Sequence, residues 1–371
     1  MNKNPGRPDY VLIGAVAILI ILGILILASV SASFSQEKFG NTFYFFNHQL
    51  LLGLIPGIIL AILGFRIPLT FIKKWAPIFL LINLIFLAMV FLPQIGLQAG
   101  GAARWLNLGF FSFQPSEFLK LTFILYLASW LSARTEKINI KKSKKEFSQT
   151  LIAFLMAIGF ISLLLIFQPD ISTLGIIILI AALVYFWAGT PLWHSILIFL
   201  IGIGGLYSLI KLAPYRANRL LVFLKPETDP LGIGYQIKQA LIAIGSGGIL
   251  GLGLGMSYQK FGFLPQSISD SIFAIFAEET GFVGSLILIS LFLIFLWQGV
   301  KIAKISPDKF SQLVCLGITS WIVIQGFINI GSMIGILPLT GTPLPFISYG
   351  GSHLIAELIG VGILLNISKY T

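Results

Sequence analysis

The sequence predicts an all-α integral membrane protein with about ten transmembrane helices and a large extracytoplasmic loop between the seventh and the eighth. Of its 371 residues, 57% are hydrophobic and only 10% are charged. The mean hydropathy of +0.97 is far above that of a soluble domain of average composition. Because no internal repeat or interdomain linker interrupts the pattern, we expect residues 1–371 to form a single membrane domain.

Long apolar runs are the second observation, since a helix that crosses a bilayer needs about 20 mostly apolar residues. The ten candidate spans are Tyr10–Ala32, Leu50–Phe65, Trp75–Leu92, Phe118–Ala133, Thr150–Phe167, Ile171–Ala188, Leu192–Leu212, Ile272–Val300, Leu313–Leu337 and His353–Ile367. The first run exceeds the apolar core of a secretion signal, about 7–15 residues, so we expect it to remain as an anchor.

The distribution of Lys and Arg is the third observation. Most of these residues fall on one side of the predicted topology, including the charge-rich connection of residues 134–145. The positive-inside rule then predicts that both termini lie in the cytoplasm. The basic residues behind the formal net charge of +11 are thereby explained, since they set the orientation of the protein in the membrane. We expect no nucleic-acid partner.

The connection after the third span, residues 94–117, carries charges that face outward on this topology. Arg104 and Trp105 combine a cation with a ring that suits the headgroup region. Glu117 and Lys120 are three residues apart and share one helix face, so they can form an ion pair. The pair is either structural or part of the wall of a substrate groove.

The largest outer segment, residues 213–271, is predicted to present a cationic surface. Arg216, Arg219 and Lys260 lie in it and are suited to a phosphate-bearing ligand. Six glycines between Gly245 and Gly255 do not follow a soluble strand, which argues against a dinucleotide site. We expect a tight re-entrant turn or close packing there instead.

Asp270 ends this segment and has two interpretations. It precedes an apolar run and is suited to cap the following helix. Alternatively it is the chemical centre, with Glu278 two steps of four residues further along the same helix face. In that arrangement the two carboxylates divide proton handling, although structural hydrogen bonding explains Glu278 equally well.

The last outer connection, Leu337–Ser352, is uncharged and rich in Pro and Gly. Irregular backbone at membrane depth must line a cavity or be buried in protein, so we expect it to close the wall opposite the Asp270 loop. The three histidines are too dispersed to suggest a metal site: His48, His194 and His353.

Several long blocks resemble one family. They are GAARWLNLGFFSFQPSEFLKL from Gly101, FQPD ending at Asp170, the block from Tyr215 through Gly255, QKFGFLPQSISDSIFAIFAEETGFVG from Gln259, and PLPFISYGGS from Pro343. In this order they resemble the SEDS proteins (shape, elongation, division and sporulation), which include FtsW, RodA and SpoVE. The Gln259-Lys260 pair and the Gly245–Gly255 segment are most like FtsW.

The resemblance implies a peptidoglycan glycosyltransferase that polymerises lipid II at the outer face of the bacterial cytoplasmic membrane, in cell division or cell-shape maintenance. It implies a class B penicillin-binding transpeptidase and other division or elongation proteins as partners. The family's essential aspartate falls on Asp270, which is expected to act as the general base. Gln266, Ile268 and Ser271 depart from the family's usual Glu, His and Phe.

Further residues are candidates for binding the substrate. Those proposed to stabilise the leaving pyrophosphate are Arg104, Lys120, Arg216, Arg219 and Lys260. Glu117, Gln259 and Glu278 are expected to line the same site. No cofactor is evident, and a divalent cation that assists the pyrophosphate is compatible with the sequence, although no spacing of ligands demonstrates one.

Two rival functions remain open. A lipid II flippase would also need polar groups within the membrane, but transporters of this kind often show inverted repeats, which the sequence lacks. A non-catalytic scaffold for the transpeptidase would need Asp270 only as a helix cap.

Overall fold

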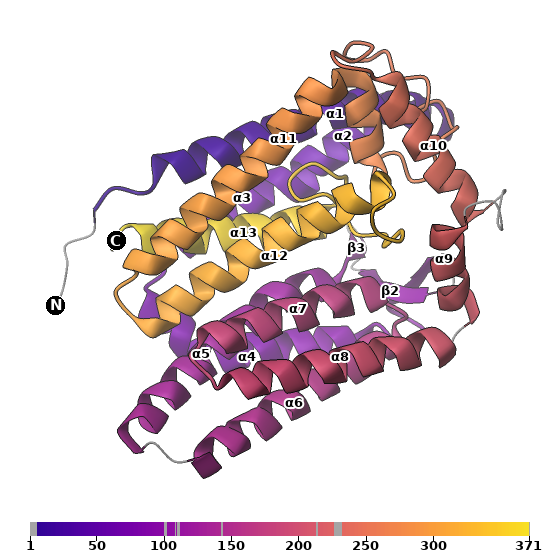
Figure 1. The fold of residues 1–371 in the computed structure, drawn as a ribbon. Helices are drawn as coiled ribbons and strands as arrows, with labels where there is room; N and C mark the ends of the chain where they lie inside the picture. Colours follow the sequence, from indigo (N-terminus) through magenta and orange to yellow (C-terminus); the bar gives the residue numbers. More distant parts are fainter. Residues whose placement is uncertain are drawn as a thin grey trace.

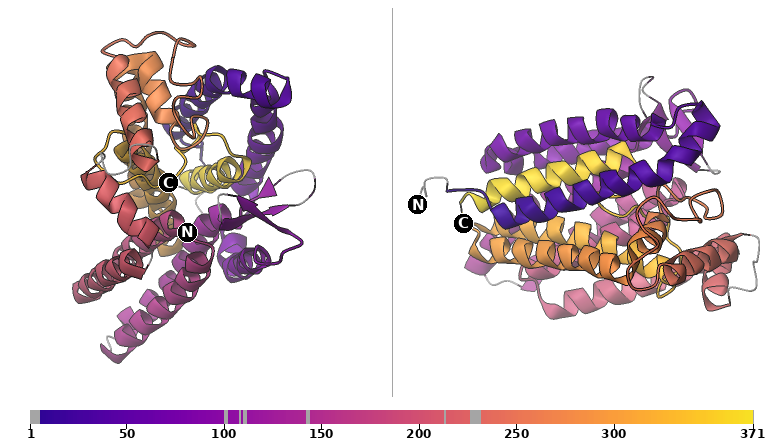
Figure 2. Two further views of the ribbon diagram at one scale, coloured as in Figure 1. Left: turned by 90° about the vertical axis from the view of Figure 1, so that its right-hand side faces the viewer. Right: turned by 90° about the horizontal axis from the view of Figure 1, so that it is seen from above.

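A computed structural model describes residues 6–99, 102–107, 109, 112–141, 144–212, 214–225 and 232–370, apart from the side chains of 98, 99, 102, 135–141, 144–147, 206, 212, 214–216 and 233. Long helices run side by side, and both described ends of the chain lie at one end of the bundle (Figures 1 and 2). There, the amide of Gly6 donates to the carbonyl of Lys369 (2.7 Å). This agrees with a topology in which both termini share one side of the membrane.

Most of the helices correspond to the predicted apolar runs, whereas α2, α9 and α10 lie outside them. Their bounds are α1 (Tyr10–Phe39), α2 (Tyr44–Gln49), the π-helix η1 (Leu50–Leu54), α3 (Ile55–Arg66), α4 (Leu69–Met89), α5 (Pro115–Lys141), α6 (Lys144–Phe167), α7 (Ile171–Trp187), α8 (Leu192–Leu212), α9 (Pro214–Leu224), α10 (Ile233–Ser246), α11 (Ile272–Ile305), α12 (Lys309–Met333) and α13 (Gly351–Ser368). Within the described residues, eight helical stretches are long and apolar enough to cross a membrane, with α2, η1 and α3 counted as one. The two other predicted spans fall on α5 and on the 17-residue α7.

A small antiparallel sheet departs from the all-helical prediction. Strands β1 (Gly96–Ala99), β2 (Ala102–Asn107) and β3 (Ser112–Phe113) pair in the order β1-β2-β3 between α4 and α5. Such short strands show too few alternations for the sequence pattern to reveal them. The sheet ends directly before α5 and so fixes where that helix begins.

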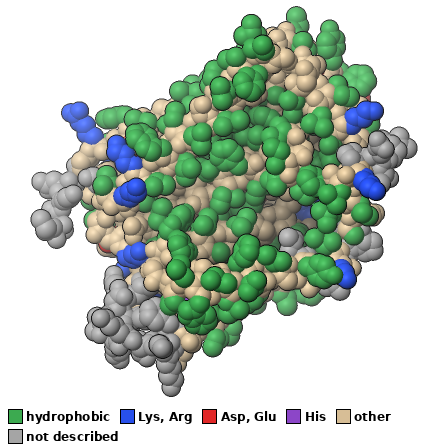
Figure 3. All heavy atoms as spheres, viewed as in Figure 1, with side chains coloured by type: hydrophobic (Ala, Val, Ile, Leu, Met, Phe, Trp, Pro, Cys, Tyr) green, Lys and Arg blue, Asp and Glu red, His purple; other side chains and the backbone are tan. Residues whose placement is uncertain are grey.

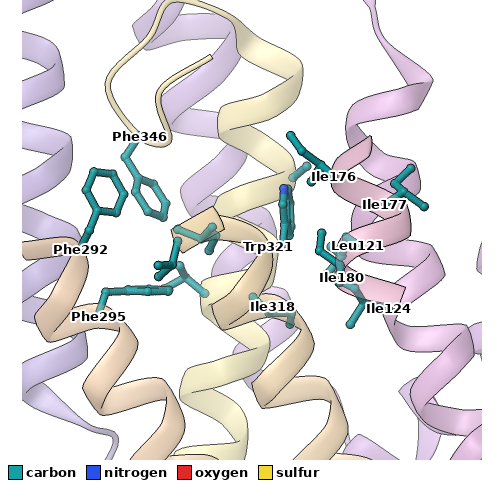
Figure 4. Close-up of a cluster of buried hydrophobic side chains, with 14 of the residues drawn as sticks. Leu121, Ile124, Ile176, Ile177, Ile180, Phe292, Phe295, Ile318, Trp321 and Phe346 are labelled. Carbon is teal, nitrogen blue, oxygen red and sulfur yellow. The ribbon is translucent and has the colours of Figure 1, made fainter. Parts of the chain in front are cut away.

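Helix α12 forms the centre of the core. Its Trp321 is completely buried and lies between aromatic side chains of α11 and isoleucines of α7 (Figure 4). Small residues allow the helices to approach closely, and a Cβ at Gly326 would lie 3.1 Å from the ring of Phe292. This tight packing fixes α11 and α12 relative to each other.

The long outer segment contains two helices, α9 and α10, and then a loop that leads into α11. Helix α10 directly precedes the glycine-rich part of this segment. Two of the six glycines are closely packed: a Cβ at Gly247 would lie 2.2 Å from the carbonyl oxygen of Ala277, and one at Gly251 would lie 2.2 Å from that of Glu279. Helix α11 is kinked at Gly281, whose φ of 69° and ψ of −165° are not helical.

Candidate active site

Asp270 lies just outside α11 and is not its cap. The helix begins at Ile272, and Ser271 occupies the capping position without a side-chain cap bond. Instead, the side-chain amide of Asn329 on α12 donates to the Asp270 carbonyl (2.8 Å) and to the Thr342 carbonyl (2.7 Å). The interpretation of Asp270 as a helix cap is therefore wrong, and its carboxylate is free of that structural task.

The Asp270 loop is attached to the last outer connection. The hydroxyl of Ser348 donates to the carbonyl of Ser269 (2.6 Å). A Cβ placed on Gly341 would lie 3.4 Å from a carboxylate oxygen of Asp270. The two segments are therefore in direct contact, whereas the sequence analysis placed the connection on the opposite wall, and it is the backbone of Gly341 that lies beside the carboxylate.

Two arginines lie close enough to influence the Asp270 carboxylate. Arg219 on α9 donates to the carbonyl of Leu339 (3.4 Å) in the last outer connection. Arg104 on β2 donates to the carbonyl of Gln168 (3.3 Å) in the turn between α6 and α7. The sheet, α9 and this turn thus bring two predicted cations to the same region.

Burial raises the pKa of Asp270 from its ordinary value to about 6, although the charges of Arg219 and Arg104 act in the opposite direction. The negative charge of Glu117 contributes a further, smaller rise in this pKa. The residue as a whole is only partly buried. A carboxylate of this pKa is suited to accept a proton near neutral pH.

The predicted ion pair of Glu117 and Lys120 is present and buried. The Lys120 ammonium lies 2.8 Å from the Glu117 carboxylate and donates to the side-chain oxygen of Gln325 (2.7 Å). The Gln325 amide in turn donates to the Pro343 carbonyl (3.1 Å) and to Glu357 (3.4 Å). The pair therefore belongs to a network beneath the last outer connection.

Gln325 and Glu357 are members of this network that the sequence analysis overlooked. Glu357 is completely buried and accepts a hydrogen bond from the amide of Phe346 (2.9 Å). Phe346 has a φ of 64°, which is unfavourable for a residue with a side chain, so this bond helps to hold a strained turn. A carboxylate within an apolar run is a recognised sign of function, and it identifies Glu357 in retrospect.

Lys260 and Glu279 form a second cluster, between α1 and the start of α11. The Lys260 ammonium lies 3.2 Å from the Glu279 carboxylate, and the hydroxyl of Ser29 on α1 donates to the same oxygen (2.7 Å). All of Lys260 but 7% is buried. The predicted phosphate-binding lysine is thus held inside the protein by α1 and α11.

Glu278 also turns away from Asp270. Its carboxylate accepts hydrogen bonds from the Ser257 hydroxyl, from the amide of Tyr258 (3.2 Å) and from the Ser246 hydroxyl (3.4 Å). Since Asp270 lies outside the helix, the predicted shared face of the two carboxylates is not formed. The alternative of structural hydrogen bonding describes Glu278.

The other predicted residues are less defined. Gln259 is partly buried, and its side-chain oxygen has no hydrogen-bond partner among the described residues. The side chain of Arg216 lies outside the described part of the structure. Within that part, no group of three or more His, Cys, Asp or Glu side chains is placed to hold a metal ion.

Comparison with known proteins explains the shared blocks. Residues 10–371 match the family described as cell cycle protein, FtsW/RodA/SpoVE. The chain belongs to this family. It is 38% identical over 371 residues to stage V sporulation protein E of Bacillus subtilis (strain 168), covering 100% of both chains. It is also 38% identical over 357 residues to the probable peptidoglycan glycosyltransferase FtsW of Coxiella burnetii, covering 95% of this chain and 94% of that one.

Solved structures of similar proteins share the fold of this FtsW/RodA/SpoVE family member. A chain of a peptidoglycan synthase complex superposes with a TM-score of 0.76 and 28% identity, covering 97% of each chain. The rod shape determining protein RodA of Thermus thermophilus superposes with a TM-score of 0.69 and 26% identity, covering 97% of this chain and 96% of that one. The likeness extends over the outer segments as well as the helices.

Proposed function

We propose that this protein is a peptidoglycan glycosyltransferase that polymerises lipid II at the outer face of the cytoplasmic membrane. Family membership and the names of relatives such as the FtsW of Coxiella burnetii support the reaction class. One structural observation carries the assignment of the site. The Asp270 carboxylate is not used as a cap, has a raised pKa and lies near two cations at the outer end of the bundle.

The reaction joins the anomeric carbon of one lipid-linked sugar to a hydroxyl oxygen of another. The new glycosidic bond forms as the bond between that carbon and the pyrophosphate oxygen breaks. Asp270 takes the hydroxyl proton, and undecaprenyl pyrophosphate leaves with the electron pair. Arg104 and Arg219 stabilise the negative charge that develops on the leaving group.

The buried ionisable residues have a supporting role in this scheme. Lys120 and Glu117 act through Gln325 on the last outer connection, which forms one wall around Asp270. Lys260 holds the glycine-rich segment through Glu279. A divalent cation that arrives with the pyrophosphate fits the scheme because it would neutralise phosphate oxygens; comparing polymerisation in EDTA and in excess Mg²⁺ tests this point.

A class B penicillin-binding transpeptidase is the proposed partner. The similar peptidoglycan synthase complex coordinates polymerisation with crosslinking, which supports such a pairing. We further propose cytoplasmic termini, because they lie together and the basic residues favour that side.

The test is glycan synthesis from labelled lipid II by the purified protein together with its cognate transpeptidase. We expect Asp270→Asn to lower the rate by at least about 100-fold, because the amide cannot accept the proton. Asp308→Asn is the matched control, since Asp308 caps α12 at the opposite end of the bundle. A thermal melt of each variant verifies folding.

Other outcomes favour the rival functions. Long strands made by folded Asp270→Asn protein would refute the base assignment. Transport of lipid II across liposome membranes without polymer formation would favour the flippase. If neither the wild type nor Asp270→Asn makes polymer, and crosslinking by the partner is unchanged, the scaffold is favoured.

A further inference from the structure

The loop between α10 and α11 has an unusual distribution of side chains. In residues 247–263, here called the glycine loop, the polar side chains Ser257 and Lys260 are buried, whereas the large apolar ones are exposed. The exposed residues are Ile249, Leu250, Leu252, Leu254, Met256, Tyr258, Phe261 and Phe263, with Leu250 79% exposed. Lys260 is the only charged residue of the loop, and it faces inward to Glu279. This pattern is the reverse of the one expected in a loop that faces water, where polar side chains are exposed and apolar ones buried.

The backbone of the glycine loop is hydrogen-bonded to the kinked start of α11. The amides of Leu252 and Gly253 donate to the carbonyls of Glu278 and Glu279, both at 3.0 Å. In the reverse direction, the Phe282 amide donates to the carbonyl of Gly248 (2.9 Å). At the kink, peptide groups that lack a partner within the helix therefore form hydrogen bonds with the loop. Backbone that enters a bilayer must have its hydrogen bonds completed in this way.

The same hydrogen bonds place the loop at the depth of the outer leaflet. Phe282 lies within the apolar stretch of α11 and is 65% exposed, and Leu286, one turn deeper, is also exposed. Lys301 is exposed and follows Phe282 by 19 positions of helix, a distance of about 28 Å at 1.5 Å per residue. Because the hydrocarbon core is about 30 Å thick and Lys301 marks its inner edge, Phe282 lies near the outer edge.

We propose that the glycine loop is a membrane anchor whose apolar side chains insert into the outer leaflet, at the boundary between headgroups and acyl chains. Its surface continues the lipid-facing surface of α11, along the upper edge of the molecule (Figure 3). Because the outward surface carries no charge, insertion depends on apolar area and not on anionic lipid.

The anchor also fixes the position of the Asp270 site relative to the bilayer, a consequence that rests on the proposed function. Six residues separate the end of the loop at Phe263 from Asp270. The intervening backbone is held in place, because the amide of Leu264 donates to the carbonyl of Gln259 (3.1 Å) and the amide of Tyr349 donates to the carbonyl of Ile268 (2.9 Å). The loop therefore fixes the height of Asp270 above the bilayer, which is where the pyrophosphate and sugar of a lipid-linked substrate lie.

Spin labels measure the depth of the loop directly. The lone Cys315 is fully buried and is replaced by alanine, and single cysteines are introduced as Leu250→Cys, Leu254→Cys and Met256→Cys. Phe282→Cys is the control for lipid contact and Glu37→Cys, at the outer end of α1, the control for water. In nanodiscs of phosphatidylcholine with and without phosphatidylglycerol, we measure accessibility to oxygen and to a water-soluble nickel complex.

We expect the loop labels to match Phe282→Cys, with high accessibility to oxygen, low accessibility to nickel and no effect of phosphatidylglycerol. Nickel accessibility at all three positions equal to that of Glu37→Cys would overturn the proposal. Labels that face water when the protein is by itself, but become immobile when the transpeptidase is added, would overturn it too, in favour of a protein partner. The measurement does not use lipid II, so it is independent of whether glycosyltransfer is the activity.

Discussion

The Asp270 site and the cluster of Lys260 and Glu279 contain the same kinds of residues, yet the structure uses them differently. Lys260 has three partners around its ammonium group, in Ser29, Glu279 and the Gly255 carbonyl. Asp270 as a residue is only partly buried, and its carboxylate lies beside the backbone of Gly341. A charge whose hydrogen bonds are complete within the protein stabilises the fold, whereas one that faces an open side can act on a substrate.

Lys260→Met gives the largest expected effect on stability. Removing one member of a buried ion pair costs about 3–5 kcal/mol, because the Glu279 carboxylate is left without its counter-charge. We therefore expect a clear fall in melting temperature, with the polymerisation rate per folded molecule retained. Lys304→Met is the control, since Lys304 is exposed. A normal melting temperature with no polymerisation would instead mean that Lys260 contacts the substrate.

Arg219→Gln tests the other region, where we expect an effect on catalysis. Loss of a cation near the leaving group is expected to lower kcat/KM by about 10–100-fold, or about 1.4–2.7 kcal/mol. Because the charge of Arg219 lowers the pKa of Asp270, its loss should also move the acidic limb of the pH profile upward. Arg66→Gln, in the last turn of α3 near the chain ends, is the control. An unchanged pH profile would show that the charge of Arg219 does not act on the Asp270 carboxylate.

The pH dependence of the wild-type protein distinguishes the two regions without a mutation. A general base must be deprotonated, and the pKa of Asp270 is raised to about 6. We expect kcat/KM to be constant above about pH 7 and to fall about tenfold per pH unit below 6. The profile of Lys260→Met should have the same acidic limb, because Lys260 is not among the groups that shift this pKa. A limb near pH 4 would contradict the raised pKa.

The sequence predicted the helices well, because an apolar run in a bilayer must satisfy its backbone within a helix. The resemblance to known blocks located Asp270, and residue spacing located the pair of Glu117 and Lys120. Spacing failed for Glu278, because its interpretation assumed that α11 includes Asp270. Glu357 was missed because its partners, Gln325 and Phe346, are distant in sequence and meet it only through packing.

Gly341→Ala gives the smallest expected loss of activity. It tests most directly how the Asp270 site differs from the cluster of Lys260 and Glu279. The φ of Gly341 is 66°, so alanine costs about 1–2 kcal/mol in backbone strain. Gly40→Ala is a matched control, because Gly40 has the same φ of 66° and no atoms within 4 Å of an added Cβ. Both variants should therefore lose similar stability.

Only Gly341→Ala should change catalysis, because its methyl group would contact the Asp270 carboxylate at 3.4 Å. This contact removes water from the charged form, which raises the pKa of Asp270 further and moves the acidic limb of the pH profile upward. We expect kcat to fall a few-fold, measured per folded molecule. Equal kinetics for the two variants would show that the open side of Asp270 at Gly341 is not where the acceptor hydroxyl binds.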